Sequence, residues 1–92
     1  MQIKFTKSFL DKLENIFASS EYILRYEKGN FKSGYCILKD NKVVVVNKYY
    51  TLDGKINTLI EIIKELNFNP QDFGDKKIQD LLIELQQTVL KL

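Results

Sequence analysis

The segment that decides the fold runs from residue 22 to residue 50 and reads YILRYEKGNFKSGYCILKDNKVVVVNKYY. It contains three apolar runs, at residues 22–27, 31–38 and 42–50, separated by Gly29-Asn30 and Asp40-Asn41. β-Branched and aromatic residues favour strands because their side chains fit a pleated surface. Gly, Asn and Asp accept the backbone conformations of tight turns. The segment therefore predicts a three-stranded antiparallel β-meander.

Side chains alternate between the two faces of a strand, so two-residue hairpins would fix both faces of this sheet. The first face then carries Tyr22, Leu24, Tyr26, Phe31, Tyr35, Ile37, Val44, Val46 and Tyr50. The second face carries Ile23, Gly34, Cys36, Leu38, Val43, Val45 and Tyr49 with the polar Arg25, Glu27, Lys32 and Asn47. Both faces are rich in apolar side chains, so either helices cover both of them or one face meets a partner.

Apolar residues at three- and four-residue steps predict helices on both sides of this segment. The first is expected at residues 5–18 and the second at residues 52–66, with Thr51 as its N-cap. Asn69-Pro70 predicts a short helical turn, and a last helix is expected at residues 76–92, capped by Asp75. The predicted fold is a single α+β domain over residues 1–92: an N-terminal helix, the meander and two C-terminal helices.

The composition excludes several classes of chemistry. The 92 residues include no His and one Cys, so no imidazole base, Cys-His pair, His-ligated zinc or internal disulfide can form. We therefore expect no enzyme activity, no cofactor and no metal. The chain has no stretch of about 18 apolar residues and its start lacks a signal peptide. A lone thiol then predicts a cytoplasmic protein with no membrane segment.

Basic and aromatic residues gather in the strand segment. Residues 22–55 hold seven Lys or Arg and three acidic residues, a net charge of +4, whereas residues 56–92 carry −2. Aromatic stacking beside phosphate-neutralising cations is typical of single-strand nucleic-acid binders. The alternative interpretation is core aromatics with solvated lysines. The candidate interaction surface consists of Arg25, Tyr26, Lys28, Phe31, Lys32, Tyr35, Lys48 and Tyr50.

Two other features were weighed as sites of chemistry. Cys36 would be reactive beside a cation such as Arg25 or Lys48, and is otherwise a small buried hydrophobe. Carboxylates one helical turn apart, Glu61 with Glu65 and Asp80 with Glu84, could bind a cation, as could the loop residues Asp72 and Asp75. Surface helices carry such pairs routinely, so we interpret them as solvated side chains.

Residues 25–36, the Val43-to-Asn47 run and the helix after it resemble a small conserved bacterial protein family of unknown function. The resemblance covers about two-thirds of the chain. It implies a shared fold and little more, because the function of that family is itself unknown.

Residues 34–65 are similar to the hairpin and helix that precede the zinc motif in regulatory metallopeptidases of the HExxH type. In an ungapped register, Glu61 and Glu65 stand where that family has its two His ligands, and Ile62 stands where it has its catalytic Glu. The resemblance thus implies a scaffold without hydrolytic activity.

The expected function is a non-catalytic, self-associating protein-interaction or regulatory module. Apolar side chains on both sheet faces and a narrow apolar stripe on the last helix indicate a homodimer. An unidentified protein partner is a further expectation. Nucleic-acid binding through the basic aromatic segment is the alternative.

Overall fold

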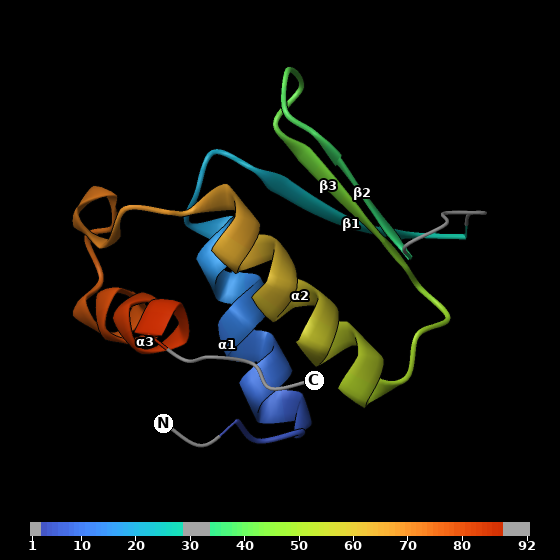
Figure 1. Cartoon of the computed structure of the whole chain (residues 1–92), viewed down its shortest axis with the longest axis horizontal. Helices are drawn as coiled ribbons and strands as arrows, with labels where there is room; N and C mark the ends of the chain where they lie inside the picture. Colours follow the sequence, from blue (N-terminus) through green and yellow to red (C-terminus); the bar gives the residue numbers. More distant parts are fainter. Residues whose placement is uncertain (1–2, 29–33, 88–92) are drawn as a thin grey trace.

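The structure, a computed structural model, describes residues 3–28 and 34–87 of the chain. It is an α+β fold, as the sequence predicts, with three α-helices and one three-stranded sheet in these residues (Figure 1). The elements are α1 (Lys7–Ala18), β1 (Ile23–Glu27), β2 (Tyr35–Leu38), β3 (Val43–Asn47), α2 (Leu52–Leu66), the 3-10 helix η1 (Pro70–Asp72) and α3 (Lys76–Gln87).

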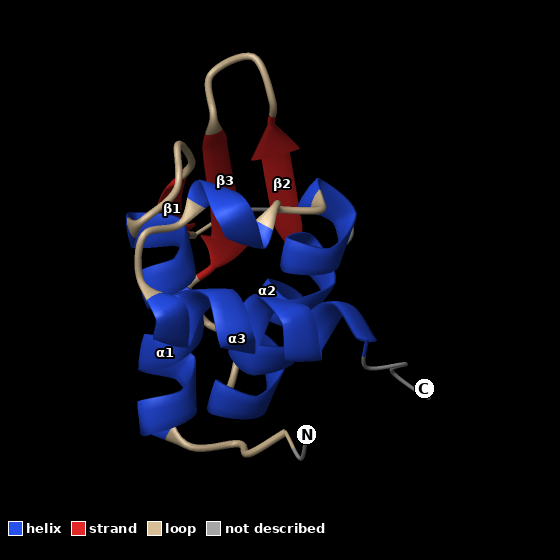
Figure 2. Ribbon diagram, turned by 90° about the vertical axis from the view of Figure 1, so that its left-hand side faces the viewer, coloured by secondary structure: helices blue, strands red, loops and turns tan. Residues whose placement is uncertain are grey.

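The predicted antiparallel meander is wrong. The strand order is β1-β3-β2, so β3 lies between the two strands that precede it in the chain (Figure 2). β3 is antiparallel to β2, with Leu38 opposite Val43, but parallel to β1, with Ile23 also opposite Val43. The sheet is therefore mixed, and β1 pairs with β3 instead of β2.

The four valines explain why β3 takes the centre. A central strand is shielded on both sides by neighbours, so the most apolar strand gains most from that position. Val44 and Val46 are fully buried and Val45 is 7% exposed. The turn after β2 spans residues 39–42, with Lys42 N–H donating to Lys39 O at 3.3 Å. Lys42, rather than Asp40 or Asn41, holds the left-handed conformation, with φ 56°. The predicted Gly29-Asn30 turn lies outside the described residues.

The predicted division of the sheet into two faces is confirmed for the described residues of the inner face. Val44 and Val46 belong to the core, and the other side chains pack against it: Tyr22, Leu24, Tyr26, Tyr35, Ile37 and Tyr50. The alternation survives the change of topology because it depends on the strand period and not on which strands pair. Phe31, predicted on the same face, lies outside the described residues.

The helix ends follow the capping side chains. Thr51 accepts a hydrogen bond from Gly54 N–H at 3.1 Å and Asn69 accepts one from Gln71 N–H at 3.0 Å, both at predicted caps. Asp75 likewise accepts from Lys77 N–H at 2.8 Å. The first helix begins later than predicted, because Thr6 caps it through Phe9 N–H at 3.1 Å. Of the last helix, residues 88–92 lie outside the described part.

All three helices lie on one side of the sheet (Figure 1). α1 and α2 pack against each other beneath the strands, and α3 contacts both of them on the side away from the sheet (Figure 1). The core gathers Leu13, Ile16 and Phe17 of α1, the isoleucines of α2 and Leu82 and Leu85 of α3. Of the two predicted alternatives, the one in which helices cover both faces of the sheet is therefore wrong for the described elements. None of the described helices has the length and apolar character needed to cross a membrane.

Candidate protein-interaction surface

The outer face of the sheet is the face that points away from the helices. The strand register arranges its side chains in three rows across β1, β3 and β2. The first row is Ile23, Val43 and Leu38, the second is Arg25, Val45 and Cys36, and the third begins with Glu27 and Asn47. The outer face is thus apolar at one end and polar at the other.

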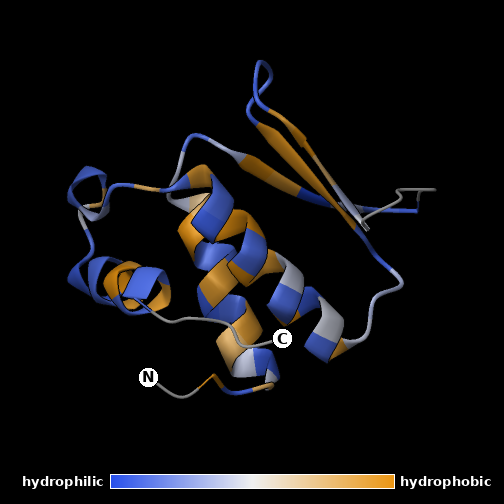
Figure 3. Cartoon of the chain, viewed as in Figure 1, coloured by the Kyte–Doolittle hydropathy of each residue, from blue (hydrophilic) through white to orange (hydrophobic). Residues whose placement is uncertain are grey.

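Exposure follows these rows. Ile23 and Leu38 of the first row are 60% and 44% exposed, whereas Val45 of the second row is almost fully buried. Val45 lies in the central strand with Arg25 on one side and Cys36 on the other, so neighbouring side chains cover it. The strands are among the most apolar segments of the fold, and no described helix covers their outer face (Figure 3).

The charges of the outer face compensate one another. Arg25 Nη2 lies 3.1 Å from Glu27 Oε1, two residues along β1 on the same side of the strand. Both side chains are about half exposed, at 58% and 45%, so the pair is solvated and contributes little to stability. Its effect is to leave this part of the face without net charge.

The described residues of the predicted interaction surface lie in different places. Arg25 is exposed on the outer face, and Lys28 is exposed just after β1. Lys48 is also exposed, and its Nζ lies 5.2 Å from the ring centre of Tyr49, which is 67% exposed. Phe31 and Lys32 lie outside the described residues.

The three predicted tyrosines lie on the inner side of the sheet. Tyr26, Tyr35 and Tyr50 all pack against the core and are half-buried. They therefore lie on the opposite side of the sheet from Arg25, and the six described residues do not form one surface.

Tyr26 joins β1 to both neighbouring helices. Its hydroxyl donates a hydrogen bond to Glu14 Oε2 of α1 at 2.5 Å, and Lys55 Nζ of α2 lies 5.1 Å from its ring centre. Burial, followed by the bond to Glu14, raises the pKa of Tyr26 well above its usual value. Tyr26 therefore stays a protonated donor at neutral pH and ties the edge strand to the helices.

Tyr35 faces the carboxylate pair on α2. Its hydroxyl lies 3.5 Å from Glu61 Oε1 and 3.5 Å from Glu65 Oε2. Burial and then the charges of Glu61 and Glu65 raise the pKa of Tyr35. The two carboxylates thus receive a phenol donor, and the described residues contain no group of three or more His, Cys, Asp or Glu that could hold a metal ion.

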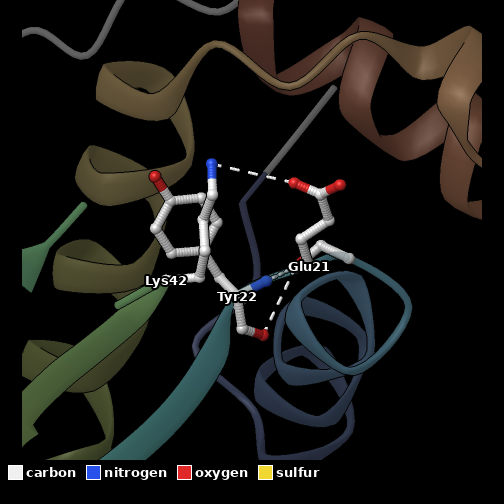
Figure 4. Close-up of polar contacts among 4 residues, drawn as sticks. Glu21, Tyr22 and Lys42 are labelled. Carbon is white, nitrogen blue, oxygen red and sulfur yellow. Dashed lines mark hydrogen bonds and ion pairs between the residues drawn. The ribbon is translucent and has the colours of Figure 1, made fainter. Parts of the chain in front are cut away.

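A pocket that sequence reasoning missed lies where α1 ends and β1 begins. It has a volume of about 650 Å³ and is lined by Tyr22, Lys42 and Phe68, among others. Lys42 Nζ lies 5.2 Å from the ring centre of Tyr22 and 3.7 Å from Glu21 Oε2 (Figure 4). No sequence signal could have joined Lys42 to Tyr22, because their proximity depends on the parallel pairing of β1 with β3.

Phe68 connects this pocket to the core. Its ring meets Phe17, Tyr22 and Phe73 edge to face, at centroid distances of 5.9, 6.1 and 5.8 Å. The aromatic cluster could not be predicted from sequence, because it joins residues of α1, of the segment before β1 and of the loop after α2. Cys36 is half-buried on the outer face, as a small side chain among apolar neighbours.

Comparison of the chain with protein-family models, curated proteins and solved structures found no match. The two resemblances therefore stay predictions, and we infer the function from the arrangement of the residues themselves.

Proposed function

We propose that this chain is a small non-catalytic interaction module of the cytoplasm that associates with a second copy of itself through its sheet. The observation that carries the proposal is the outer face, where Ile23 and Leu38 are exposed although they belong to strands. A sheet with one solvated face ordinarily alternates apolar with polar residues. An apolar outer face is typical of a contact surface.

A second copy suits this face because the face is nearly neutral. Arg25 and Glu27 of one strand already compensate each other, so two such faces meet without a net repulsion. Most soluble oligomers are symmetric homodimers that use the same patch twice. A chain of 92 residues buries a modest share of its surface alone, which makes association a common source of added stability.

The size of the outer face predicts that stacking of two faces alone would be weak. A strand of 5 residues spans about 16 Å, and three strands span about 14 Å, which gives a footprint of roughly 230 Å². A standard interface buries about 800 Å² on each partner. The module therefore needs more of the sheet than its outer face for stable association.

The proposal of a non-catalytic role is supported by the partners of the polar groups. Tyr26 and Tyr35 donate to carboxylates on α1 and α2. Their raised pKa values keep them protonated, so neither acts as a base at neutral pH.

The test is the mass of the chain in solution as a function of concentration, measured by sedimentation equilibrium. The wild type should shift from one chain toward two as concentration rises. Ile23→Lys places a charge on the outer face at β1 and should weaken the association. Ile83→Lys on α3 is the matched control, because it makes the same change at another exposed isoleucine, 43% exposed against 60% for Ile23.

A mass of one chain at every concentration would overturn the proposal. Equal loss of association in both variants would also contradict it, because the sheet would then have no special part in the contact. The expected result is that Ile83→Lys retains the dimer and that the variant on the sheet does not.

A further inference from the structure

β1 is an edge strand of the sheet, and one of its two sides faces no strand among the described residues. Ile23 N–H donates to Lys42 O at 2.8 Å, and Glu27 O accepts from Lys48 N–H at 3.1 Å, so these two residues face β3. Backbone polar groups of alternate residues point to opposite sides of a strand. Leu24 and Tyr26 therefore direct their N–H and C=O groups to the free side, where no strand of the described chain pairs with them.

Space for another strand exists beside this edge. An open groove of about 460 Å³ is lined by Glu14 and Ala18 of α1 and by Leu24 and Tyr26 of β1, among others. Figure 2 shows β1 at one edge of the sheet, with β3 next to it and β2 at the other edge. An exposed edge of this kind is a template for pairing with another chain.

We infer that the second copy joins at this edge, where the two β1 strands pair antiparallel about Tyr26 and merge the two sheets into one of six strands. This inference rests on the proposed self-association and names the surface that performs it. In this arrangement the two outer faces lie side by side instead of stacking, and the contact comes from the backbone, because each hydrogen-bonded residue pair exchanges two backbone bonds.

The charges of β1 select the register. Free-edge residues must face free-edge residues, and at least three residues of each β1 strand must overlap, which leaves pairing centred on Leu24, on Arg25 or on Tyr26. Centring on Arg25 places two arginines opposite each other, and centring on Leu24 places Glu27 opposite Glu21 of the other copy. Both arrangements set like charges against each other, which destabilises a cross-strand pair.

Centring on Tyr26 is the favourable register. It places Arg25 of each copy directly opposite Glu27 of the other, at a separation of about 5 Å between Cβ atoms. Each Arg25 then lies between two carboxylates, its own Glu27 at 3.1 Å and that of the second copy. The pairs are at the surface, so they fix the register while the backbone bonds supply the affinity.

β2, at the other side of the sheet, offers no such selection. Asn47 N–H donates to Gly34 O at 2.9 Å, so Tyr35 and Ile37 direct their backbone groups to the free side of β2. The strand has four residues, none of them charged, so no charged pair would favour one register over another. A pocket of about 440 Å³ also lies at the end of β2, lined by Ile37, Leu38 and the turn residues 39–41. Pairing through β2 is the alternative that the experiment must exclude.

The experiment uses two charge-reversal variants of the full chain. Arg25→Glu gives a strand with two carboxylates, and Glu27→Arg gives a strand with two guanidinium groups. Each variant alone should dimerise about tenfold more weakly than the wild type, or worse, because like charges face each other twice. An equimolar mixture should regain the wild-type affinity, because every cross-strand pair is then opposite in charge.

Loss of the intrachain Arg25–Glu27 pair cannot explain recovery on mixing, because neither variant has that pair. Lys76→Glu and Asp80→Lys on α3 form the matched control, since these residues are exposed and one helical turn apart. Each control variant should associate like the wild type, with no gain on mixing.

Amide hydrogen exchange by NMR locates the contact. Protection of the Leu24 and Tyr26 amides should rise with concentration together with the dimer. Protection of Tyr35 and Ile37 instead would assign the contact to β2 and overturn the inference. A dimer without edge protection, or one that mixing fails to restore, would overturn it too, although the proposed function would stand. A monomeric wild type would instead remove the proposed function itself.

Discussion

The phenol oxygen of Tyr50 lies 1.4 Å from the point that a Cβ on Gly34 would occupy. Gly34 also has φ +82°, in the region that side chains other than glycine rarely adopt. The start of β2 thus depends on the missing side chain of Gly34 for two reasons, conformation and space. Tyr50, which follows β3, uses that space to pack against the core.

Gly34→Ala should therefore lower the free energy of unfolding by about 2–3 kcal/mol, the sum of the backbone strain and the displacement of Tyr50. Gly74→Ala is the matched control, because nothing lies within 4 Å of its Cβ position. It should be neutral or slightly stabilising. Urea unfolding of both variants is the measurement, and equal stability would show that Tyr50 moves aside without cost.

Tyr26→Phe should cost about 1–2 kcal/mol at pH 7, because it removes the hydrogen bond to Glu14 and keeps the ring beside Lys55. Tyr49→Phe should have no effect, because Tyr49 is 67% exposed. The measurement is chemical unfolding of both variants and the wild type. A cost equal to that of Tyr49→Phe would contradict a stabilising role for the Glu14 bond.

The hydrogen bond between Tyr26 and Glu14 also predicts that the stability of the fold depends on pH. The folded chain raises the pKa of Tyr26 above its usual value of 10.0, so the fold favours the protonated phenol. That stabilisation is complete below about pH 10 and is lost as the pH rises beyond it. The stability gap between the wild type and Tyr26→Phe should thus stay constant from pH 7 to 9 and narrow above pH 10. A gap that widens there would contradict the assignment.

Lys42 offers a test of the turn between β2 and β3. Lys42→Asn and Lys42→Val both remove the ammonium group beside Tyr22 and Glu21, so their difference isolates the backbone. Residue 42 has φ 56°, in the left-handed region. Lys42→Asn should therefore leave the free energy of unfolding nearly unchanged, whereas Lys42→Val should lower it by about 1–2 kcal/mol, because β-branched residues tolerate this region poorly. Thermal unfolding measures both, and equal stability of the two variants would rule out a left-handed residue 42.

Zinc should leave the melting temperature unchanged, even though Glu61 and Glu65 stand at the ligand positions of the metallopeptidase resemblance. The pair supplies two carboxylates without nitrogen or sulfur ligands, and the Tyr35 hydroxyl donates toward both. A site filled at 100 times its Kd would add about 2.7 kcal/mol. Calorimetry with and without zinc decides, and a shift that disappears in Glu61→Gln would contradict the prediction.

We expect the chain not to bind single-stranded nucleic acid, even at low salt. Base stacking needs exposed aromatic rings beside cations, and Tyr26, Tyr35 and Tyr50 instead pack against the core. Fluorescence anisotropy with mixed oligonucleotides at low salt is the measurement. Binding that weakens steeply with salt and is lost in Lys48→Glu would contradict this expectation and favour the exposed Lys48–Tyr49 pair as a contact site.

The faces of the strands and most helix caps could be predicted from sequence, because both depend on local rules. Alternation assigned Val44 and Tyr26 to one face whichever strands paired, and the Thr51 and Asn69 side chains capped their helices as expected. Thr6 was not predicted as the N-cap of α1, because Phe5 fits the apolar stripe and moved the expected start of the helix to residue 5. In the structure Phe5 precedes the helix and is 44% exposed.

Strand pairing could not be predicted, because a short hairpin and a strand inserted between its predecessors satisfy the same alternation. The division of the candidate surface between the two sides of the sheet could not be predicted for a related reason. The pattern placed Tyr26 and Tyr35 on one face, but which face the helices cover depends on contacts distant in sequence. Arg25 was assigned to the same surface, although it lies on the opposite side of the sheet.

The insertion of β3 between β1 and β2 also sets the order in which the sheet can form. Leu38 and Val43 are separated by 5 residues, whereas Ile23 and Val43 are separated by 20. Closing the longer loop costs about 1.2 kcal/mol more in chain entropy, which corresponds to a rate roughly eightfold lower. The β2–β3 hairpin should therefore close first and β1 should join last, so the edge strand proposed to meet the second copy is also the last to be secured.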